Sequence, residues 1–222
     1  MSNTRYNKVL TVILVILLIA ILGIAGYFGY EYYKKYTNNK ETTSVLQEFD
    51  KIIIELPKEE SPNNNTNVED PSKDKKVNTG IDTKELYYRG YKVIGKLEMP
   101  SVNLKYPILD MLTDAKAIDY SIAMQYGAGI NKIGNTVIIG HNTYNGTFFG
   151  KNKKMNIGDS IFATDLNGNR VEYEIYNKYS TPGSDFSYAS KNTNGVKELT
   201  LVTCENNNKN RLIICAKEKN NI

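Results

Sequence analysis

Hydrophobic positions fall into two patterns along the chain: one long uncharged run near the N-terminus, and short strand-like runs in the C-terminal half. The first run, "VLTVILVILLIAILGIAGYFGY", occupies residues 9–30. As a helix, these 22 residues would extend about 33 Å and cross a hydrocarbon core of roughly 30 Å. The pattern therefore predicts a transmembrane helix at 9–30 behind a short tail at 1–8.

A cleaved signal peptide is the competing interpretation of this run. The apolar core of a signal peptide spans roughly 7 to 15 residues and ends in a small-residue cleavage site, whereas this run is longer and lacks such a site. The flanking charges do not choose an orientation, because Arg5 and Lys8 on one side are matched by Lys34, Lys35 and Lys40 on the other.

Residues 31–80 have the composition of a stalk followed by a flexible linker. At 44–56, "SVLQEFDKIIIEL" places apolar residues at helical intervals, and its first residue, Ser44, has the spacing of a capping box with the glutamine that follows. A short amphipathic helix is expected there. Residues 57–80 are polar and punctuated by proline, with few apolar groups to offset the entropy of ordering. A folded domain at 81–222 would then be tethered to the membrane.

The C-terminal part of the chain repeats short runs of β-branched and aromatic residues between turn residues, which is typical of a barrel or sandwich. Asn167 and Gly168 form the dipeptide most typical of a tight hairpin. One helix interrupts the pattern: Asp114 can cap "AKAIDYSIAM", in which Ala117 and Met124 would share a face. A mostly β domain with one or two short helices is expected, with strands at 91–99, 103–109, 135–141, 159–165, 169–179, 198–204 and 211–218.

Composition narrows the class of function. The hydrophobic content of 41% and aromatic content of 10% are sufficient for one globular domain with a sizeable core. The 28 basic and 24 acidic residues give a net charge of only +4, and no dense basic run or nucleic-acid-binding motif accompanies the 17 tyrosines. We therefore expect no nucleic-acid partner.

Two side chains suited to nucleophilic catalysis stand at the ends of predicted strands. His141, the one histidine of the chain, ends "NTVIIGH", and Cys204 ends "ELTLVTC". Catalytic groups are commonly displayed where rigid strands give way to loops, and an imidazole can activate a thiol by taking its proton. A solvated histidine and a cysteine packed in the core are the alternative interpretations.

Arg211 opens the run that follows Cys204. If 198–204 and 211–218 form an antiparallel hairpin across "ENNNKN", Cys204 and Arg211 lie opposite each other, with Cβ atoms about 4.5 to 5.5 Å apart. The guanidinium could then stabilise an oxyanion at the thiol, or it could merely solubilise the turn. Cys215 lies about 13 Å further along the strand, too far for a disulfide with Cys204, so a buried free thiol is expected. Two cysteines and one histidine are too few for a structural zinc site unless carboxylates complete it, and no metal or cofactor is expected.

These motifs resemble those of the sortases, membrane-tethered cysteine transpeptidases of Gram-positive bacteria. The string "TLVTC" at 200–204 is followed by "RLII" at 211–214, and "GH" at 140–141 ends an earlier strand. The resemblance covers about residues 90–218. It implies a closed β-barrel of about eight strands, preceded by the transmembrane helix.

The resemblance also implies a role for individual residues. Catalysis would rest on Cys204 as nucleophile, His141 as acid and base, and Arg211 as oxyanion or substrate clamp. The residues that flank this set are expected to contact substrate: Asn142, Thr203 and Glu205.

The function implied is cleavage of an LPxTG-like sorting motif near the C-terminus of a secreted surface protein, through a thioester, and transfer of that protein to an amine of a cell-wall precursor. No cofactor is involved. The usual topology of the family places the N-terminus in the cytoplasm and the catalytic domain outside the cell, on a single membrane span.

Two functions of other kinds compete with this one, a membrane-tethered cysteine peptidase and a non-enzymatic extracellular β-barrel binding module. Papain-like peptidases place the cysteine before the histidine, whereas here His141 precedes Cys204. L,D-transpeptidases carry a Ser-His-Gly-Cys cluster that this chain lacks. Within the sortases, the short segment at 180–197 has no long helical insertion of the class B kind, which favours a compact class D, A or E arrangement.

Overall fold

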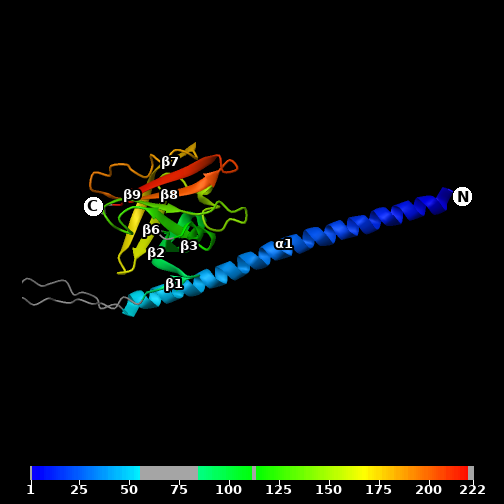
Figure 1. The fold of residues 1–222 in the computed structure, drawn as a ribbon, viewed down its shortest axis with the longest axis horizontal. Helices are drawn as coiled ribbons and strands as arrows, with labels where there is room; N and C mark the ends of the chain where they lie inside the picture. The colour runs from blue at the N-terminus through cyan, green and yellow to red at the C-terminus, as the bar shows by residue number, and fades with distance from the viewer. Residues whose placement is uncertain (1, 56–84, 112–113, 220–222) are drawn as a thin grey trace, which may run out of the picture.

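A computed structural model describes residues 2–55, 85–111 and 114–219. One long helix precedes a small β domain that contains three short 3-10 helices in its described part (Figure 1). The helices are α1 (Ser2–Glu55), η1 (Pro100–Val102), η2 (Ala115–Asp119) and η3 (Asn152–Lys154). The strands are β1 (Tyr87–Tyr88), β2 (Tyr91–Met99), β3 (Leu104–Asp110), β4 (Ile122–Tyr126), β5 (Gly134–Ile139), β6 (Ser160–Asp165), β7 (Arg170–Pro182), β8 (Lys197–Glu205) and β9 (Asn210–Glu218).

The strands close into a barrel in the order β2-β3-β4-β5-β8-β9-β7-β6, with β6 pairing back onto β2 and β1 attached outside to β2. The expected closed barrel of about eight strands is confirmed. The pairs β3–β4 and β5–β8 are parallel, and the other pairs are antiparallel. Parallel neighbours cannot be joined by a tight turn, so β5 and β8 come together only through the segment at 140–196 that separates them.

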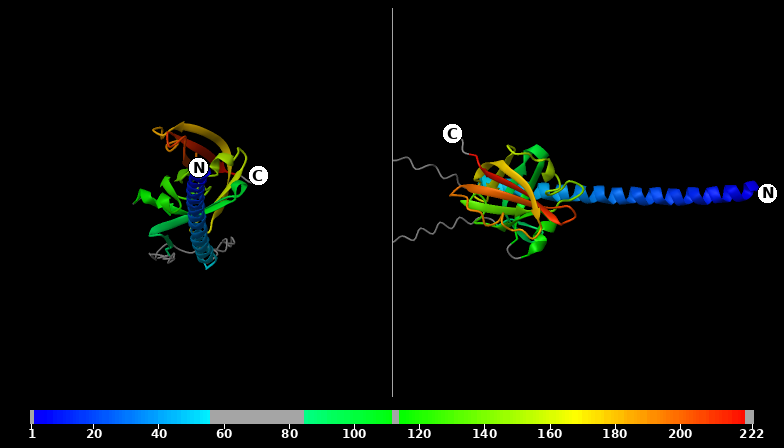
Figure 2. Two further views of the ribbon diagram at one scale, coloured as in Figure 1. Left: turned by 90° about the vertical axis from the view of Figure 1, so that its right-hand side faces the viewer. Right: turned by 90° about the horizontal axis from the view of Figure 1, so that it is seen from above.

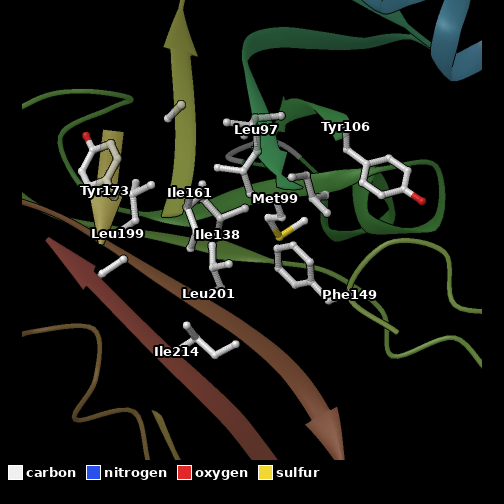
Figure 3. Packing of buried hydrophobic residues seen from close by; sticks show 14 of the residues in the cluster. Leu97, Met99, Tyr106, Ile138, Phe149, Ile161, Tyr173, Leu199, Leu201 and Ile214 are labelled. Atoms are coloured by element: carbon white, nitrogen blue, oxygen red, sulfur yellow. The ribbon is translucent and has the colours of Figure 1, made fainter. Parts of the chain in front are cut away.

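Apolar side chains from neighbouring strands fill the barrel interior (Figure 3). Tyr173 brings a hydroxyl into this interior: it donates to Asn131 Oδ1 at 2.9 Å, and Asn131 donates in turn to the carbonyls of Ala163 and Asn169. These bonds satisfy polar groups that would be costly to bury alone. The side chains labelled in Figure 3 that are almost completely buried include Leu97, Met99, Ile138, Phe149, Ile161, Leu199, Leu201 and Ile214.

The outer face of β5, β8 and β9 is also covered, which explains why β8 is buried along most of its length. Tyr188, from the segment after β7, packs there with Val137, Val202 and Ile213. Its backbone carbonyl accepts a hydrogen bond from Asn135 Nδ2 at 2.9 Å. The strand that ends in Cys204 is therefore held from both faces of the sheet.

All seven predicted strands are present, and the hairpin expected at Asn167 and Gly168 joins β6 to β7. Gly168 has a φ of +81°, and a Cβ there would lie 2.8 Å from the side chain of Ile53 on α1, so glycine meets two constraints at once. The short strands β1 and β4 were not expected.

The predicted helix "AKAIDYSIAM" is correct only in its first half. Asp114 accepts a hydrogen bond from the Lys116 backbone amide at 2.9 Å and caps η2, as expected. The helix ends at Asp119, and Met124 lies in β4 rather than on a helical face with Ala117. The buried residues of β4 pair with both β3 and β5, and this pairing outweighs the local helical pattern.

Helix α1 continues without a break from Ser2 to Glu55, so the expected membrane span and amphipathic helix are two parts of one element. Residues 31–43 contain no proline or glycine that would interrupt it. Ser44 consequently lies inside the helix and does not cap a helix start. The linker expected at 57–80 lies outside the described residues.

The last turns of α1 pack on the barrel instead of standing free as a stalk (Figure 2). Phe49 is only 1% exposed. Two turns earlier in the helix, Glu41 accepts hydrogen bonds from Arg89 on both carboxylate oxygens, and next to Phe49 the Asp50 carboxylate pairs with Lys96. The apolar surface that receives Phe49 is formed by Leu86, Tyr88, Val93, Leu109, Ala117 and Ala123.

We predict that Phe49→Ala lowers the free energy of unfolding by about 3 kcal/mol, because it removes a buried aromatic ring and leaves a cavity. Urea unfolding of the full chain in detergent micelles would measure the change. Ile54→Ala is the matched control, since Ile54 is 81% exposed and its loss should cost less than about 0.5 kcal/mol. Equal effects of the two substitutions would contradict the packing of α1 described here.

Candidate active site

The site is built where three adjacent strands of the barrel end or begin. Strands β5 and β8 run parallel, with Ile139 paired to Val202. The ladder continues past the end of β5, because the Gly140 amide donates to the Val202 carbonyl at 3.2 Å and the Thr203 hydroxyl donates to the Gly140 carbonyl at 2.7 Å. This extension places His141 beside the end of β8, next to Cys204.

Gly140 has a packing role in this arrangement. A Cβ at this position would lie 2.9 Å from the Ile122 side chain and 3.0 Å from Phe149, closer than ordinary contacts allow. The "GH" pair therefore combines a residue that lets the strand pass close to the core with the imidazole that follows it.

Cys204 and Arg211 occupy opposite positions in the β8–β9 hairpin, as expected. The turn between them is formed by Asn206, Asn207 and Asn208, all with positive φ, a conformation that asparagine adopts more readily than most residues. Arg211 Nη1 donates to the carbonyls of Asn208 and Asn210 at 3.0 and 3.1 Å. The turn thus holds the guanidinium at the mouth of the hairpin.

One cavity of about 200 Å³ brings the three candidate catalytic residues together. Cys204 and His141 are both partly exposed, so a substrate can reach them. The cavity is lined by Ile118, Gln125, Ile139, Gly140, His141, Phe186, Tyr188, Val202, Thr203, Cys204 and Arg211. A thiol, an imidazole and a fixed guanidinium around one opening are the groups needed for nucleophilic attack on a carbonyl, proton transfer and oxyanion stabilisation.

A second hollow, of about 490 Å³, shares Cys204 with this cavity and is lined by two of the expected substrate-contact residues. Asn142 donates from Nδ2 to the Cys204 carbonyl at 2.8 Å. Glu205 pairs with Lys153 at 3.3 Å. A hydrogen bond from Ser180, together with the Lys153 ammonium, lowers the pKa of the Glu205 carboxyl from its usual value. The third expected residue, Thr203, is buried, and its hydroxyl is engaged with the backbone of Gly140.

Asp119 is a member of the site that the sequence analysis missed. Its Oδ1 lies 2.9 Å from His141 Nε2, and the two side chains are 58% and 41% exposed. Asp119 ends η2, in the segment where the sequence suggested a longer helix. No local pattern links it to a histidine 22 residues later, and only the tertiary fold brings the end of η2 and His141 together.

Cys215, the second cysteine, is free and only 3% exposed, as expected. It pairs with Thr200 in the β8–β9 ladder, four positions below the pair formed by Cys204 and Arg211. Its thiol packs with Val137 in the cluster on the outer face of the sheet and does not reach the cavity.

Known proteins share both the sequence features and the fold. A family model of the Sortase domain matches residues 97–219, more than half of the 222-residue chain. Sortase A of Bacillus anthracis is 25% identical over 170 residues, which are 76% of this chain and 75% of that protein.

Solved structures give a consistent result for the fold. Sortase A from Corynebacterium diphtheriae superposes with a TM-score of 0.53 at 23% identity, covering 59% of this chain and 62%, less than two thirds, of that chain. A sortase D5 transpeptidase of Clostridium perfringens superposes with a TM-score of 0.52 at 29% identity, covering 58% of this chain and 79% of that chain. Because the family match extends from β2 to the end of β9 and includes all the strands around the site, the chain belongs to the sortase family of cysteine transpeptidases.

Proposed function

We propose that this sortase cleaves an LPxTG-like sorting motif near the C-terminus of secreted surface proteins and transfers them to an amine of a cell-wall precursor. The observation that carries the proposal is the single cavity lined by His141, Cys204 and Arg211 at three neighbouring strand ends.

In the first half of the reaction, the Cys204 thiolate attacks the carbonyl carbon of the scissile peptide bond. The developing oxyanion is stabilised by Arg211, whose guanidinium is already oriented by the carbonyls of the β8–β9 turn. His141, as imidazolium, gives its proton to the leaving amine. The peptide C–N bond breaks, and the acyl group remains on Cys204 as a thioester.

In the second half, an amine of the cell-wall precursor attacks the thioester carbonyl. His141 accepts a proton from this amine, the C–S bond breaks, and Cys204 leaves as the thiolate. One amide bond replaces another, so the reaction conserves bond energy and requires no nucleotide. Water in place of the amine would release the acid, which is the outcome expected of a simple peptidase.

Asp119 has a supporting role in this proposal. Its hydrogen bond to His141 Nε2 orients the ring and leaves Nδ1 for proton transfer. Asn142 and Glu205 lie beside Cys204 in the second hollow and are proposed to contact the polypeptide on either side of the scissile bond. Thr203 supports the site by tying β8 to Gly140.

The N-terminal helix contains the one described segment that is long and apolar enough to cross a membrane. We propose a single span, with the N-terminus in the cytoplasm and the barrel outside the cell, where both substrates are found. The identity to a sortase D5 supports a compact subclass.

Cys204→Ala should abolish both peptide cleavage and transfer to an added amine, because the nucleophile is lost. Cleavage of an LPxTG-like fluorogenic peptide by the full chain in detergent would measure the effect. Cys215→Ala is the control and should retain activity, since its thiol lies away from the cavity. Turnover by the Cys204→Ala variant would refute the proposed mechanism, and hydrolysis without any amine transfer would favour a peptidase.

Arg211→Ala should lower kcat by about 10²- to 10³-fold, the usual cost of losing one oxyanion donor. Arg211→Lys should lose less, since the charge remains but the forked geometry does not. Arg170→Ala serves as the control, because Arg170 pairs with Glu98 at the other end of β7. A kcat for Arg211→Ala within about threefold of the native value would contradict the assignment.

Asp119→Asn should lower kcat by about 1.4- to 5-fold, because an exposed ion pair contributes roughly 0.2 to 1 kcal/mol. KM should be unaffected if Asp119 acts through His141 and not on substrate. Asp114→Asn removes a nearby carboxylate that bonds Lys116 and Tyr91 instead, and should leave kcat unchanged. Identical kinetics for the two variants would exclude the orienting role.

A further inference from the structure

The continuous helix α1 fixes the distance between the barrel and the membrane. Its 54 residues extend about 81 Å, and the uncharged run at 9–30 accounts for about 33 Å of that length. A group of tyrosines marks the end of this run, and each is more than half exposed: Tyr27, Tyr30, Tyr32, Tyr33 and Tyr36. Tyrosine is enriched where a helix leaves the hydrocarbon, so the headgroup layer lies at this level of α1.

The active-site loop is bonded to α1 at the same level. Lys35 Nζ donates to the backbone carbonyl of Asn145 at 3.2 Å. Lys35 lies five residues beyond Tyr30, about 7.5 Å along the axis, and each headgroup layer is roughly 5 to 7 Å thick. The loop at 142–150, which directly follows His141, is therefore placed at the membrane surface.

The orientation of the barrel agrees with this placement. In two views, the orange-to-red turn between β8 and β9 lies at the end of the barrel toward which the N-terminal part of α1 projects (Figures 1 and 2, right). Cys204 and Arg211 flank this turn. The end of the β8–β9 hairpin that carries both residues thus points toward the apolar N-terminal part of α1 and not away from it.

Tyr144, at the tip of the loop, is the most exposed large hydrophobic side chain of the described barrel, at 109% of its reference area. Its ring therefore packs on no neighbour in the described part of the chain, and an amphipathic ring prefers the lipid interface. Lys35 and Lys151 flank the loop and donate to backbone carbonyls, so these bonds do not neutralise their charge. Anionic headgroups would attract both.

We propose that the Cys204 end of the barrel rests on the headgroup layer of an anionic bilayer, with Tyr144 in contact with lipid and α1 as a strut of fixed length. The inference rests on the proposed function for its membrane anchor. It adds a limit on the substrate. Because α1 fixes the distance between the site and the membrane, the enzyme would cleave sorting motifs only where a tethered protein emerges close to the membrane surface.

Tryptophan fluorescence tests the contact, because the chain has no tryptophan. The full-length Tyr144→Trp variant would be reconstituted in phosphatidylglycerol–phosphatidylcholine vesicles with bromine atoms near the carbonyl end of the acyl chains. We expect its emission to fall at least about twofold relative to unbrominated vesicles. Ile133→Trp is the matched control, exposed but before β5 at the opposite end of that strand from His141, and its emission should not change. Equal quenching of both variants, or of neither, overturns the proposal.

A helix insertion separates this inference from the proposed function. Seven helix-forming residues placed after Tyr30 would raise the barrel by about 10 Å with nearly two full turns, so its orientation is kept. Combined with this insertion, the Tyr144→Trp variant should lose its quenching. Because Tyr144 also lines the hollow beside Cys204, cleavage of a soluble peptide is compared with that of Tyr144→Trp without the insertion, and the two rates should be equal. The same insertion after Asn64, beyond the contacts of α1 with the barrel, should leave the quenching of Tyr144→Trp intact. Persistent quenching after the first insertion overturns the inference, whereas absent peptide cleavage in the native chain overturns the proposed function alone.

Discussion

The register of three strands, β5, β8 and β9, is the constraint on which the site depends. Ile139, Val202 and Ile213 form one row across these strands, so residues two positions further along β5 and β8, and two positions earlier in β9, share the next level at the barrel mouth. That level holds His141, Cys204 and Arg211. Because side chains alternate between faces, a slip of one residue in any strand would turn one of them away from the cavity.

Burial on both faces of β8 maintains this register. The interior cluster holds its inner side chains, and the segment that carries Tyr188 covers the outer ones. Cys204 and His141 lie at the ends of these packed strands, and their side chains are partly exposed there. The asparagine-rich turn has a defined role in this frame, since its positive φ values direct the Asn208 carbonyl toward the Arg211 guanidinium.

Packing also fixes the position of helix α1 relative to the barrel. Phe49 and the two ion pairs around it attach the helix to the barrel, and Lys35 attaches it again beside the active-site loop. A helix that contacts the barrel at two levels fixes the position of its apolar N-terminal part relative to the candidate site. The apolar side chains of α1 at 45–53 are therefore a part of the domain core and not of a free tether.

The sequence by itself determined seven of the strands, the β6–β7 hairpin, the long apolar N-terminal helix and the pairing of Cys204 with Arg211, because each of these follows from local periodicity or from one turn. It could not determine that η2 ends at Asp119 and yields to β4, since the pairing of β4 with β3 and β5 is non-local. For the same reason, the contact of Asp119 with His141 and the docking of α1 were decided only by the tertiary structure. Closing the barrel brings residues distant in sequence to one end, and the properties of the individual residues do not reveal which of them will be in contact.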